Sequence, residues 1–441
     1  MSQPAATPSA AAPVKGRRPN IVLIVADDLG YSDLSCTGSS LVRTPRIDSL
    51  ARDGALFDNM YAPAPTCTPS RAGLMTGRYA QRVGLPRVIF PEEPLGLSGE
   101  ETTAAQMLGQ AGYRCGIFGK WHLGARAAHH PRRHGFDRFV GLPYSNDMHP
   151  LRLWVDDQEL PDPVDQTILT RRYTDEAIDF IDAAGDRPFF VYLPHTMPHI
   201  PLHVEESFRG TSEAGTYGDT IECIDHHVGR LLDHLDRRGL AENTLVIVTS
   251  DNGPWFEGGT GGLRGRKIDT YEGGIKMPFL ARWPGVIEAG RRVGDLGCFI
   301  DLVPTFAALA GTAPPSDVDG IDLSAVLTGG TAGQDRPLFF FSNWSLNAVR
   351  RGRWKLHLDR FPTKDRRELP QLFDLERDPQ ECYNLRTLFP EEFAELLDLA
   401  TGFAEEIRTQ RPQAEARAGM PPEQVYEPTS ASDDAPPRES A

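Results

Sequence analysis

The sequence predicts an α/β fold in which helices cover both faces of a sheet, followed by a small antiparallel-sheet subdomain. Apolar stretches of strand length alternate with amphipathic stretches of helix length through most of the chain. The first stretch, NIVLIVADD at residues 20–28, is a run of Ile, Val and Leu that ends in two aspartates, which is typical of a strand buried on both faces. After about Thr328 the pattern changes to short strand-like stretches, which indicates a second sheet.

Capping residues and apolar spacing predict the elements of the large sheet in order. Thr44-Pro45 opens the first helix, with threonine as N-cap and proline in the first turn, and Gly54 closes it. A longer helix over about 217–237 carries Ile, Val and Leu on one face. The other predicted elements are a helix at 102–110, a strand near 114–118, a helix at 174–184, and the strands PFFVYL and TLVIVTSDNG.

Four parts are predicted along the chain. Residues 1–18 and 410–441 are rich in Pro, Ala and polar residues, and we expect both to be disordered. Residues 19–330 form the predicted main domain. Residues 331–409 form a small α+β subdomain, in which LFFFSN, AVRRGRWKLHL and PQLFDLE are short strands and a helix lies near 390–408.

Composition and charge argue against several classes of protein. The chain of 441 residues has a net charge of −15, whereas a nucleic-acid-binding protein needs a basic face, so we expect no nucleic-acid partner. None of the scattered cysteines forms a C-x-x-C pair, which argues against a zinc site or a disulfide framework. The N-terminus lacks the apolar core of a signal peptide, and no stretch reaches transmembrane length. We therefore expect no membrane partner and a cytoplasmic protein, with export left open.

Oxygen-bearing side chains follow two of the predicted strands. Asp27-Asp28 ends the first strand, and Asp251-Asn252 ends the strand near 245–250. In open α/β sheets, ligands bind outside the carboxyl ends of the strands, so these side chains are expected to converge. Oxygen ligands favour Ca²⁺, Mg²⁺ or Mn²⁺ over zinc. The alternative is that each pair caps a helix that follows its strand.

Basic side chains follow strands at the same inferred edge of the sheet. They are Lys120 and His122 in GKWHLG, His195, His199 and His203 in PHTMPHIPLH, and Arg266 and Lys267 in GRKIDTYEGG. In an extended backbone, Lys120 and His122 point to one side. A basic pocket in an acidic protein favours an anionic substrate that is bound through its oxygens.

The stretch PTCTPSRAGLMTG, residues 65–77, carries a resemblance to a known family. It contains the pattern C-x-P-S-R-x-x-x-x-T-G, matched by Cys67, Pro69, Ser70, Arg71, Thr76 and Gly77. This pattern resembles the signature of the type I sulfatases of the alkaline-phosphatase-like superfamily. The resemblance runs from Asn20 to about Asn384 and includes ADDLG, GYRCGIFGKWHLG, SDNG, TYEGG and LFDLERDP. The stretch GFDRFVGLPYSNDMHP is most similar to the arylsulfatase A and N-acetylgalactosamine-6-sulfatase branch.

The resemblance implies an alkaline-phosphatase-like sandwich fold, with a large mixed, mostly parallel sheet flanked by helices. It also implies two cofactors. A separate maturation enzyme would oxidise Cys67 to Cα-formylglycine, and the hydrated aldehyde, a gem-diol, would attack the sulfur of a sulfate ester. One Ca²⁺ per chain would be held by Asp27, Asp28, Asp251 and Asn252, with position 67 completing its ligands. The implied enzyme is a sulfuric ester hydrolase that acts on a small aryl sulfate or a sulfated saccharide.

The resemblance also implies individual roles, carried over residue by residue. Arg71 would orient the diol, Lys120 would bind sulfate oxygens, and His122 would be the base that releases sulfate. His199, assisted by Lys267, would protonate the leaving alcohol, and Asp251 would take the proton of the attacking hydroxyl. Ser145 and His195 would bind substrate.

Three alternatives remain open from the sequence. Cys67 could be an ordinary buried thiol or a thiol nucleophile activated by a helix N-terminus. The chain could be a formylglycine-dependent phosphonate monoester or phosphodiester hydrolase, although those enzymes tend to have Asp-His where this chain has Asp251-Asn252. It could also be a non-catalytic protein that binds sulfated glycans.

Overall fold

The computed structural model describes residues 18–161, 163–332, 335–358 and 369–425. Two sheets form its framework, one of eleven strands and one of four. In spatial order, the large sheet contains β11 (Arg291–Cys298), β2 (Ala55–Tyr61), β10 (Phe279–Arg282), β8 (Thr244–Ser250), β1 (Asn20–Ala26), β7 (Phe189–Pro194), β3 (Arg114–Lys120), β4 (Arg138–Leu142), β5 (Trp154–Val155) and β6 (Gln158–Glu159), while β9 (Lys276–Met277) pairs with β2.

The centre of the large sheet is parallel. β8, β1, β7, β3 and β4 are neighbours that all run in one direction, and the antiparallel pairs lie toward the two edges. Side chains of β1 alternate between the two faces: Ile21 and Leu23 enter one apolar core, and Val22 and Ile24 enter the other. Both faces are therefore covered, as the continuous apolar run predicted.

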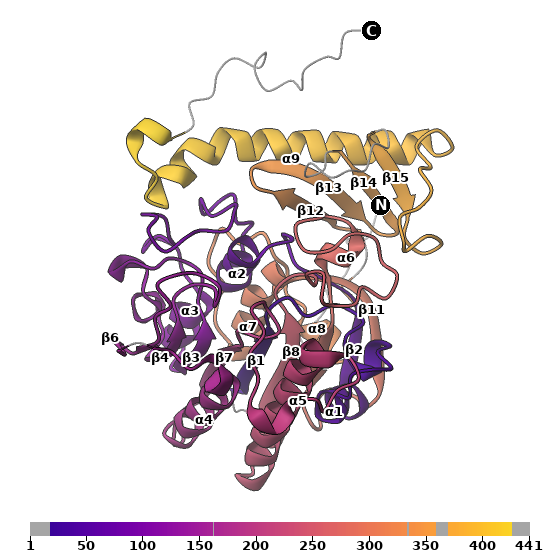
Figure 1. Ribbon diagram of the computed structural model, residues 1–441. Helices are drawn as coiled ribbons and strands as arrows, with labels where there is room; N and C mark the ends of the chain where they lie inside the picture. The colour runs from indigo at the N-terminus through magenta and orange to yellow at the C-terminus, as the bar shows by residue number, and fades with distance from the viewer. Residues whose placement is uncertain (1–17, 162, 333–334, 359–368, 426–441) are drawn as a thin grey trace, which may run out of the picture.

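Helices cover each face of the large sheet (Figure 1). One core holds α2 (Cys67–Thr76), α3 (Ala104–Gln110), α7 (Leu302–Ala310) and α8 (Ser324–Leu327), and the other holds α1 (Pro45–Arg52), α4 (Leu169–Asp182) and α5 (Gly215–Arg237). The short helix α6 (Glu272–Ile275) leads into β9. The predicted α/β class is confirmed. None of the helices in the described residues combines the length and apolar character needed to cross a membrane.

The first predicted helix shows how local sequence fits the fold. Thr44 is the N-cap residue of α1, as predicted, but its hydroxyl does not accept from an N–H of the helix. It donates to Asp48 Oδ1 at 2.8 Å and accepts from the backbone N–H of Ser35 at 2.9 Å. Gly54 follows the helix at a close approach, because a Cβ atom there would lie 2.2 Å from the carbonyl oxygen of Ala281. Glycine is thus needed where the chain enters β2 beside β10.

The small sheet forms a second layer with the last long helix. It contains β12 (Pro337–Ser342), β13 (Ser345–Arg351), β14 (Trp354–His357) and β15 (Gln371–Asp374), all antiparallel. The helix α9 (Pro390–Arg417) lies across this sheet (Figure 1). The rings of Phe339 and Phe403 stack with centroids 3.9 Å apart and join the helix to the sheet.

The prediction that the chain is disordered from residue 410 onward is wrong for the first residues of that tail. α9 continues through Pro412 to Arg417, so the first eight residues of the predicted tail, 410–417, are helical. Ala414 lies against Gly84, and Arg417 donates to the carbonyl of Arg82 at 2.8 Å. These tertiary contacts outweigh the helix-breaking effect of a proline. Residues 1–17 and 426–441 of the two predicted disordered ends lie outside the described residues.

Candidate active site

Five neighbouring parallel strands supply most of the polar side chains at one edge of the large sheet. Asp27 and Asp28 follow β1, Asp251 and Asn252 follow β8, Lys120 ends β3, and His122, Ser145 and His199 lie in the turns after β3, β4 and β7. Lys267 comes from the loop between β8 and α6. In the described chain, neither aspartate pair leads directly into a helix, so the helix-capping interpretation is wrong.

The residues of the motif at Cys67 form a single helix, and that helix fixes their geometry. α2 begins at Cys67, and Ser70 and Arg71 lie three and four residues further on, so all three share one face. That face points at the strand ends. The Cys67 thiol lies 3.7 Å from Asp27 Oδ1, and Ser70 Oγ donates to the carbonyl oxygen of Asp251.

The last motif residues hold the other end of α2 in place. Thr76 Oγ1 donates to the carbonyl of Ala72 at 2.7 Å, and Gly77 ends the helix in the left-handed conformation with φ of 72°. A Cβ atom at Gly77 would lie 3.0 Å from atoms of both Val303 and Val318. The motif therefore specifies a short helix that is anchored tightly enough to aim Cys67 and Arg71.

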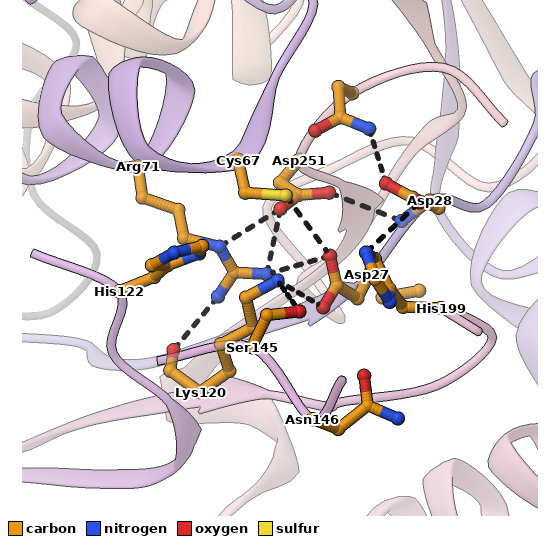
Figure 2. A network of polar contacts seen from close by, with 12 residues as sticks. Asp27, Asp28, Cys67, Arg71, Lys120, His122, Ser145, Asn146, His199 and Asp251 are labelled. Atoms are coloured by element: carbon orange, nitrogen blue, oxygen red, sulfur yellow. Dashed lines mark hydrogen bonds and ion pairs between the residues drawn. The ribbon is translucent and has the colours of Figure 1, made fainter. Parts of the chain in front are cut away.

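Asp27 is fully buried between two cations (Figure 2). Lys120 Nζ donates to Asp27 Oδ2 at 2.6 Å, and Arg71 Nη2 lies 3.5 Å from Oδ1. Burial raises the pKa of Asp27, but the positive charges around it, Lys120 first, outweigh burial and hold the pKa well below its usual range. Burial lowers the pKa of Lys120, but the negative charge of Asp27 outweighs burial, so the pKa of Lys120 lies above its usual value. The pair is therefore ionised at neutral pH.

Asp28 joins three further side chains at the site. It has an unusual φ of 64°, a region in which non-glycine residues are uncommon. Asn252 Nδ2 donates to Asp28 Oδ1 at 2.6 Å, and Lys267 Nζ donates to Oδ2 at 2.7 Å. His199 Nε2 lies 3.6 Å from the same Oδ2 atom. His199 and Lys267 thus both lie beside the same oxygen of Asp28.

The oxygen atoms at the strand ends fit a divalent cation. The side chains with ligand atoms within 4.8 Å of one another are Asp27, Cys67 and Asp251 in one set, and Asp28, Cys67 and His199 in another. Asn252 Oδ1 is buried and has no hydrogen-bond partner among the described residues. A buried amide oxygen that lacks a donor, beside carboxylates, suits a hard cation such as Ca²⁺ or Mg²⁺.

The charges of the cluster indicate what else it can bind. Its carboxylates are Asp27, Asp28 and Asp251, and its permanent cations are Arg71, Lys120 and Lys267. Burial raises the pKa of Asp251, although its ion pair with Arg71, 2.8 Å long, opposes the increase. A bound divalent cation would leave net positive charge in a buried site, which favours an anionic substrate.

A second group of side chains of metal-binding types has its hydrogen-bonding atoms already paired with other protein groups. Glu205, Cys223 and His227 also have ligand atoms within 4.8 Å of one another. Arg230 Nη1 donates to His227 Nδ1 at 3.0 Å, so Nε2 carries the ring proton and donates to Glu205 Oε1 at 2.6 Å. Arg171 lies 3.7 Å from the other oxygen of Glu205. We therefore assign no metal to this group.

His122 is held as a neutral base. It is buried and has φ of 58°, a conformation that costs a non-glycine residue about 1–3 kcal/mol. Its Nε2 lies 3.1 Å from the carbonyl oxygen of Ile89, which can only accept, so Nε2 carries the proton. Burial, then Lys120 and Arg71, hold the pKa of His122 well below its usual range. Its Nδ1 lone pair has no partner among the described residues.

The structure brings Ser145 to the cluster, and Asn146 beside it was not predicted. Lys120 Nζ donates to Ser145 Oγ at 3.1 Å, so both can face one anion. Asn146 Nδ2 donates to the carbonyl of Pro201, at 3.1 Å, and Asn146 Oδ1 is buried without a hydrogen-bond partner in the described chain. Asn146 directly follows Ser145 in the stretch YSND, and this adjacency is the feature of the sequence that could have predicted its place at the site.

The structure does not bring His195 to the cluster, so its predicted contact with substrate is wrong. Side chains of β7 alternate, and Phe189, Val191 and Leu193 all enter the core under α4 and α5. His195 continues that alternation, and its ring lies 6.5 Å from the ring of Tyr173 on α4. It is fully buried, and neither ring nitrogen has a partner among the described residues.

As an unmodified thiol, Cys67 would be a poor nucleophile. Its side chain is 2% exposed. Burial raises its pKa to about 12 even though Lys120 and Lys267 oppose the increase. A thiol reacts as its thiolate, so the thiol-nucleophile alternative is not supported by this environment.

The chain matches known proteins along most of its length. The sequence model of the family described as Sulfatase matches residues 19–312, and one described as N-sulphoglucosamine sulphohydrolase, C-terminal, matches residues 266–401. N-acetylgalactosamine-6-sulfatase of Mus musculus is 36% identical over 88% of this chain and 86% of its own length. Arylsulfatase A of Homo sapiens is 39% identical over 84% of this chain and 83% of its own. The solved structure of Ps i-CgsB in complex with k-i-k-neocarrahexaose has a TM-score of 0.81 and 29% identity, covering 88% of this chain and 93% of that one.

Proposed function

Because this chain belongs to the sulfatase family and is a sulfuric ester hydrolase, we propose that it works through Cα-formylglycine at position 67 and one bound Ca²⁺. The observation that carries the proposal is the shared face of α2. That face directs Cys67 and Arg71 at the carboxylates that end β1 and β8. A nucleophile at position 67 would therefore stand beside both the metal ligands and the donors that bind an anion.

Formylglycine formation is expected before the chain has folded. The Cys67 side chain is buried and lies in the first turn of a helix, so a maturation enzyme cannot reach it in the folded protein. We propose that such an enzyme reads the short motif in extended form. When hydrated, the aldehyde supplies one hydroxyl for attack on sulfur and a second whose deprotonation releases sulfate.

The strand-end oxygens are proposed to hold the cation. Asp27, Asp28, Asp251 and Asn252 are the ligands, and the unpartnered Asn252 Oδ1 is the atom that most needs one. Ca²⁺ at this place supplies positive charge that lowers the pKa of a hydroxyl and stabilises sulfuryl oxygens. Asp251 Oδ2, held by Arg71 at 2.9 Å, is the proposed acceptor of the proton from the attacking hydroxyl.

Donors on both sides of the cluster bind and orient the sulfate group. Lys120 Nζ and Ser145 Oγ are 3.1 Å apart and are placed to contact neighbouring oxygens of one anion. Arg71, one helical turn from position 67, orients the side chain there. Such charge-assisted donors act where negative charge develops, and loss of one typically costs about 10²–10³ in rate.

Two proton transfers are assigned to opposite sides of position 67. His199 and Lys267 share Asp28 Oδ2 and are proposed to protonate the oxygen of the leaving alcohol. His122 is neutral, with its Nδ1 lone pair directed away from the Ile89 carbonyl, and is proposed to accept the proton whose loss releases sulfate. The arrangement separates the acid from the base.

The names of the relatives favour a sulfated saccharide as substrate. N-acetylgalactosamine-6-sulfatase and a protein solved with k-i-k-neocarrahexaose are both similar to this chain. We propose a sulfated saccharide as the natural substrate, with small aryl sulfates cleaved as well. A cytoplasmic location stays a prediction.

The test is sulfate release by the protein purified from its native host. We expect release from 4-nitrophenyl sulfate, loss of release when a chelator removes Ca²⁺, and recovery when Ca²⁺ is restored. Cleavage of a phosphonate monoester at a higher kcat/KM than any sulfate ester would favour the phosphonate hydrolase instead. Binding of a sulfated glycan without any release of sulfate would favour a non-catalytic protein.

A further inference from the structure

A cavity of about 450 Å³ lies beside Lys267. Its walls come from one loop, residues 254–269, that joins β8 to α6. The lining side chains include Trp255, Phe256, Arg266 and Lys267, with Asp269 on the same loop. This volume falls in the range of about 300–1,000 Å³ that is typical of sites for small organic ligands.

Lys267 connects this cavity to the site of chemistry. Its Nζ donates to Asp28 Oδ2 at 2.7 Å, while the residue also lines the cavity. The proposed role of Lys267 is to assist protonation of the leaving alcohol, so the alcohol part of the substrate must lie on the Lys267 side of the sulfur atom. The cavity therefore lies on the side to which the rest of the substrate would extend.

The loop around the cavity is braced on several sides. Lys267 N–H donates to the carbonyl of Pro254 at 3.0 Å, which closes the loop on itself. Ile268 N–H donates to the carbonyl of Pro65, at 2.9 Å, two residues before Cys67. Arg266 Nη1 donates to the carbonyls of Trp255 and Gly258, at 2.9 and 2.6 Å. The aromatic residues of the loop are thus held at a defined place relative to position 67.

Trp255 and Phe256 present aromatic surface at the mouth of this cavity. Their rings meet edge to face, with centroids 4.9 Å apart and an interplanar angle of 84°. Phe256 is 71% exposed, an unusual exposure for a large apolar side chain. The guanidinium of Arg266 lies 5.7 Å from the centre of the Phe256 ring. Phe256 is exposed and Trp255 is partly buried, so this aromatic pair on a braced loop is not part of the apolar core.

We propose that Trp255 and Phe256 form a saccharide subsite that stacks against the sugar ring bearing the sulfate ester or the ring next to it. This inference rests on the proposed function. The apolar face of a pyranose packs on an aromatic ring, while its hydroxyls need hydrogen-bond partners. The cavity supplies both, because Thr260, Arg266 and Asp269 line it together with the aromatic pair. A pocket for a simple aryl group would not need polar side chains around the ring.

The test compares two substrates on matched variants. We expect Trp255→Ala with Phe256→Ala to lower kcat/KM for a 6-O-sulfated N-acetylgalactosamine disaccharide about 10–50-fold, since stacked apolar area is lost. The same variant should keep kcat/KM for 4-nitrophenyl sulfate within about twofold. Leu388→Ala, at a residue equally exposed in a different segment, should change neither value.

The outcomes separate the subsite from the proposed function. Equal losses on both substrates, or no loss on the disaccharide, would overturn the subsite while leaving the sulfatase activity in place. Wild-type protein that releases sulfate from 4-nitrophenyl sulfate and from no sulfated saccharide would also overturn it. If the wild type releases no sulfate at all, the proposed function fails, and binding is then measured: quenching of tryptophan fluorescence by the disaccharide that is absent in the Trp255→Ala variant supports the subsite, and no difference overturns it.

Discussion

Two buried clusters of carboxylates and cations lie in different parts of this molecule, and only one of them is built for chemistry. The catalytic cluster is the set Asp27, Asp28, Asp251, Asn252, Arg71, Lys120 and Lys267 at the edge of the large sheet. The sheet-joining cluster is the set Glu272, Lys355, Glu381 and His357, where α6 meets the small sheet. Lys355 Nζ lies 2.9 Å from both Glu272 Oε1 and Glu381 Oε1.

The two clusters differ in whether their side-chain oxygens all have hydrogen-bond donors. In the sheet-joining cluster, the second oxygen of Glu272 accepts from Tyr61 at 2.6 Å, and that of Glu381 accepts from a backbone N–H at 2.7 Å. Every carboxylate oxygen there has a protein donor. In the catalytic cluster, Asn252 Oδ1 has no hydrogen-bond partner among the described residues, and the Cys67 thiol lies within 4.8 Å of oxygens from three carboxylates. Unpartnered ring nitrogens do not distinguish the clusters, because His357 Nδ1 in the sheet-joining cluster and His122 Nδ1 beside the catalytic cluster both lack a partner in the described chain. Buried charge by itself is therefore a weak sign of catalysis, and an unsatisfied oxygen acceptor beside a modifiable side chain is a stronger one.

The comparison predicts that the catalytic cluster can lose activity without losing stability. Cys67→Ala should lower kcat/KM for 4-nitrophenyl sulfate by about 10⁴-fold or more, because the nucleophile is removed. The melting temperature should change by only a few degrees, because a small side chain is removed. Cys115→Ala, at an equally buried cysteine, is the matched control and should keep its activity. Sulfate release that survives Cys67→Ala would contradict the assigned nucleophile.

The sheet-joining cluster should behave in the opposite way. Lys355→Met leaves Glu272 and Glu381 buried without their shared cation and should lower the free energy of unfolding by about 3–5 kcal/mol. The kcat of the folded fraction should be unchanged. Adding Glu272→Gln should restore part of the lost stability in urea unfolding. A Lys355→Met protein that is stable but inactive would show that the two clusters are not separate in function.

Titration of Glu272 should make the free energy of unfolding depend on pH in the acidic range. Burial raises the pKa of Glu272, but Lys355 and Arg350 outweigh it and lower the pKa to about 2. Because this folded-state pKa lies below the unfolded value of about 4.5, the contribution to stability is present above pH 4.5. It is lost as the pH falls toward 2, by up to about 3 kcal/mol. Urea unfolding of the wild type should show this loss, and Glu272→Gln should show less of it. Parallel pH profiles would be evidence against an ionised Glu272 in the fold.

Removing an oxygen ligand should weaken the response to Ca²⁺ more than it weakens the fold. In Asn252→Ala, we expect about 10–100-fold more Ca²⁺ to be needed for half-maximal sulfate release, because one proposed ligand is missing. Thermal stabilisation by added Ca²⁺ should shift to higher concentration by the same factor, since bound ligand stabilises the native state. An unchanged calcium dependence would remove Asn252 from the ligand set.

Much of this site follows from sequence because parallel strands bring their carboxyl ends together. Asp27 and Asp251 are far apart in the chain, yet the order of the strands makes them neighbours. The roles assigned to Arg71, Lys120 and Lys267 needed the family resemblance, because a lone basic residue carries little information. The failure at His195 has a different origin. His195 and His199 both follow β7, but the alternation of side chains along the strand sends His195 to the opposite face.

The fold was harder to predict where tertiary contacts decide. β2, with the sequence ALFDNMY, and β11, with RRVGDLGC, lack the continuous apolar run of a central strand and were not predicted. Both lie toward one edge of the large sheet, where polar side chains are tolerated. The end of α9 was missed because Pro412 is a local stop signal that contacts with Gly84 and Arg82 override.

The most direct test of the account is the mass of the peptide that contains residue 67, taken from a preparation whose sulfate release has been measured. The account predicts that the thiol has been replaced by an aldehyde, and that the specific activity rises in proportion to the converted fraction. Full activity in a preparation whose Cys67 is entirely an unmodified thiol would contradict it.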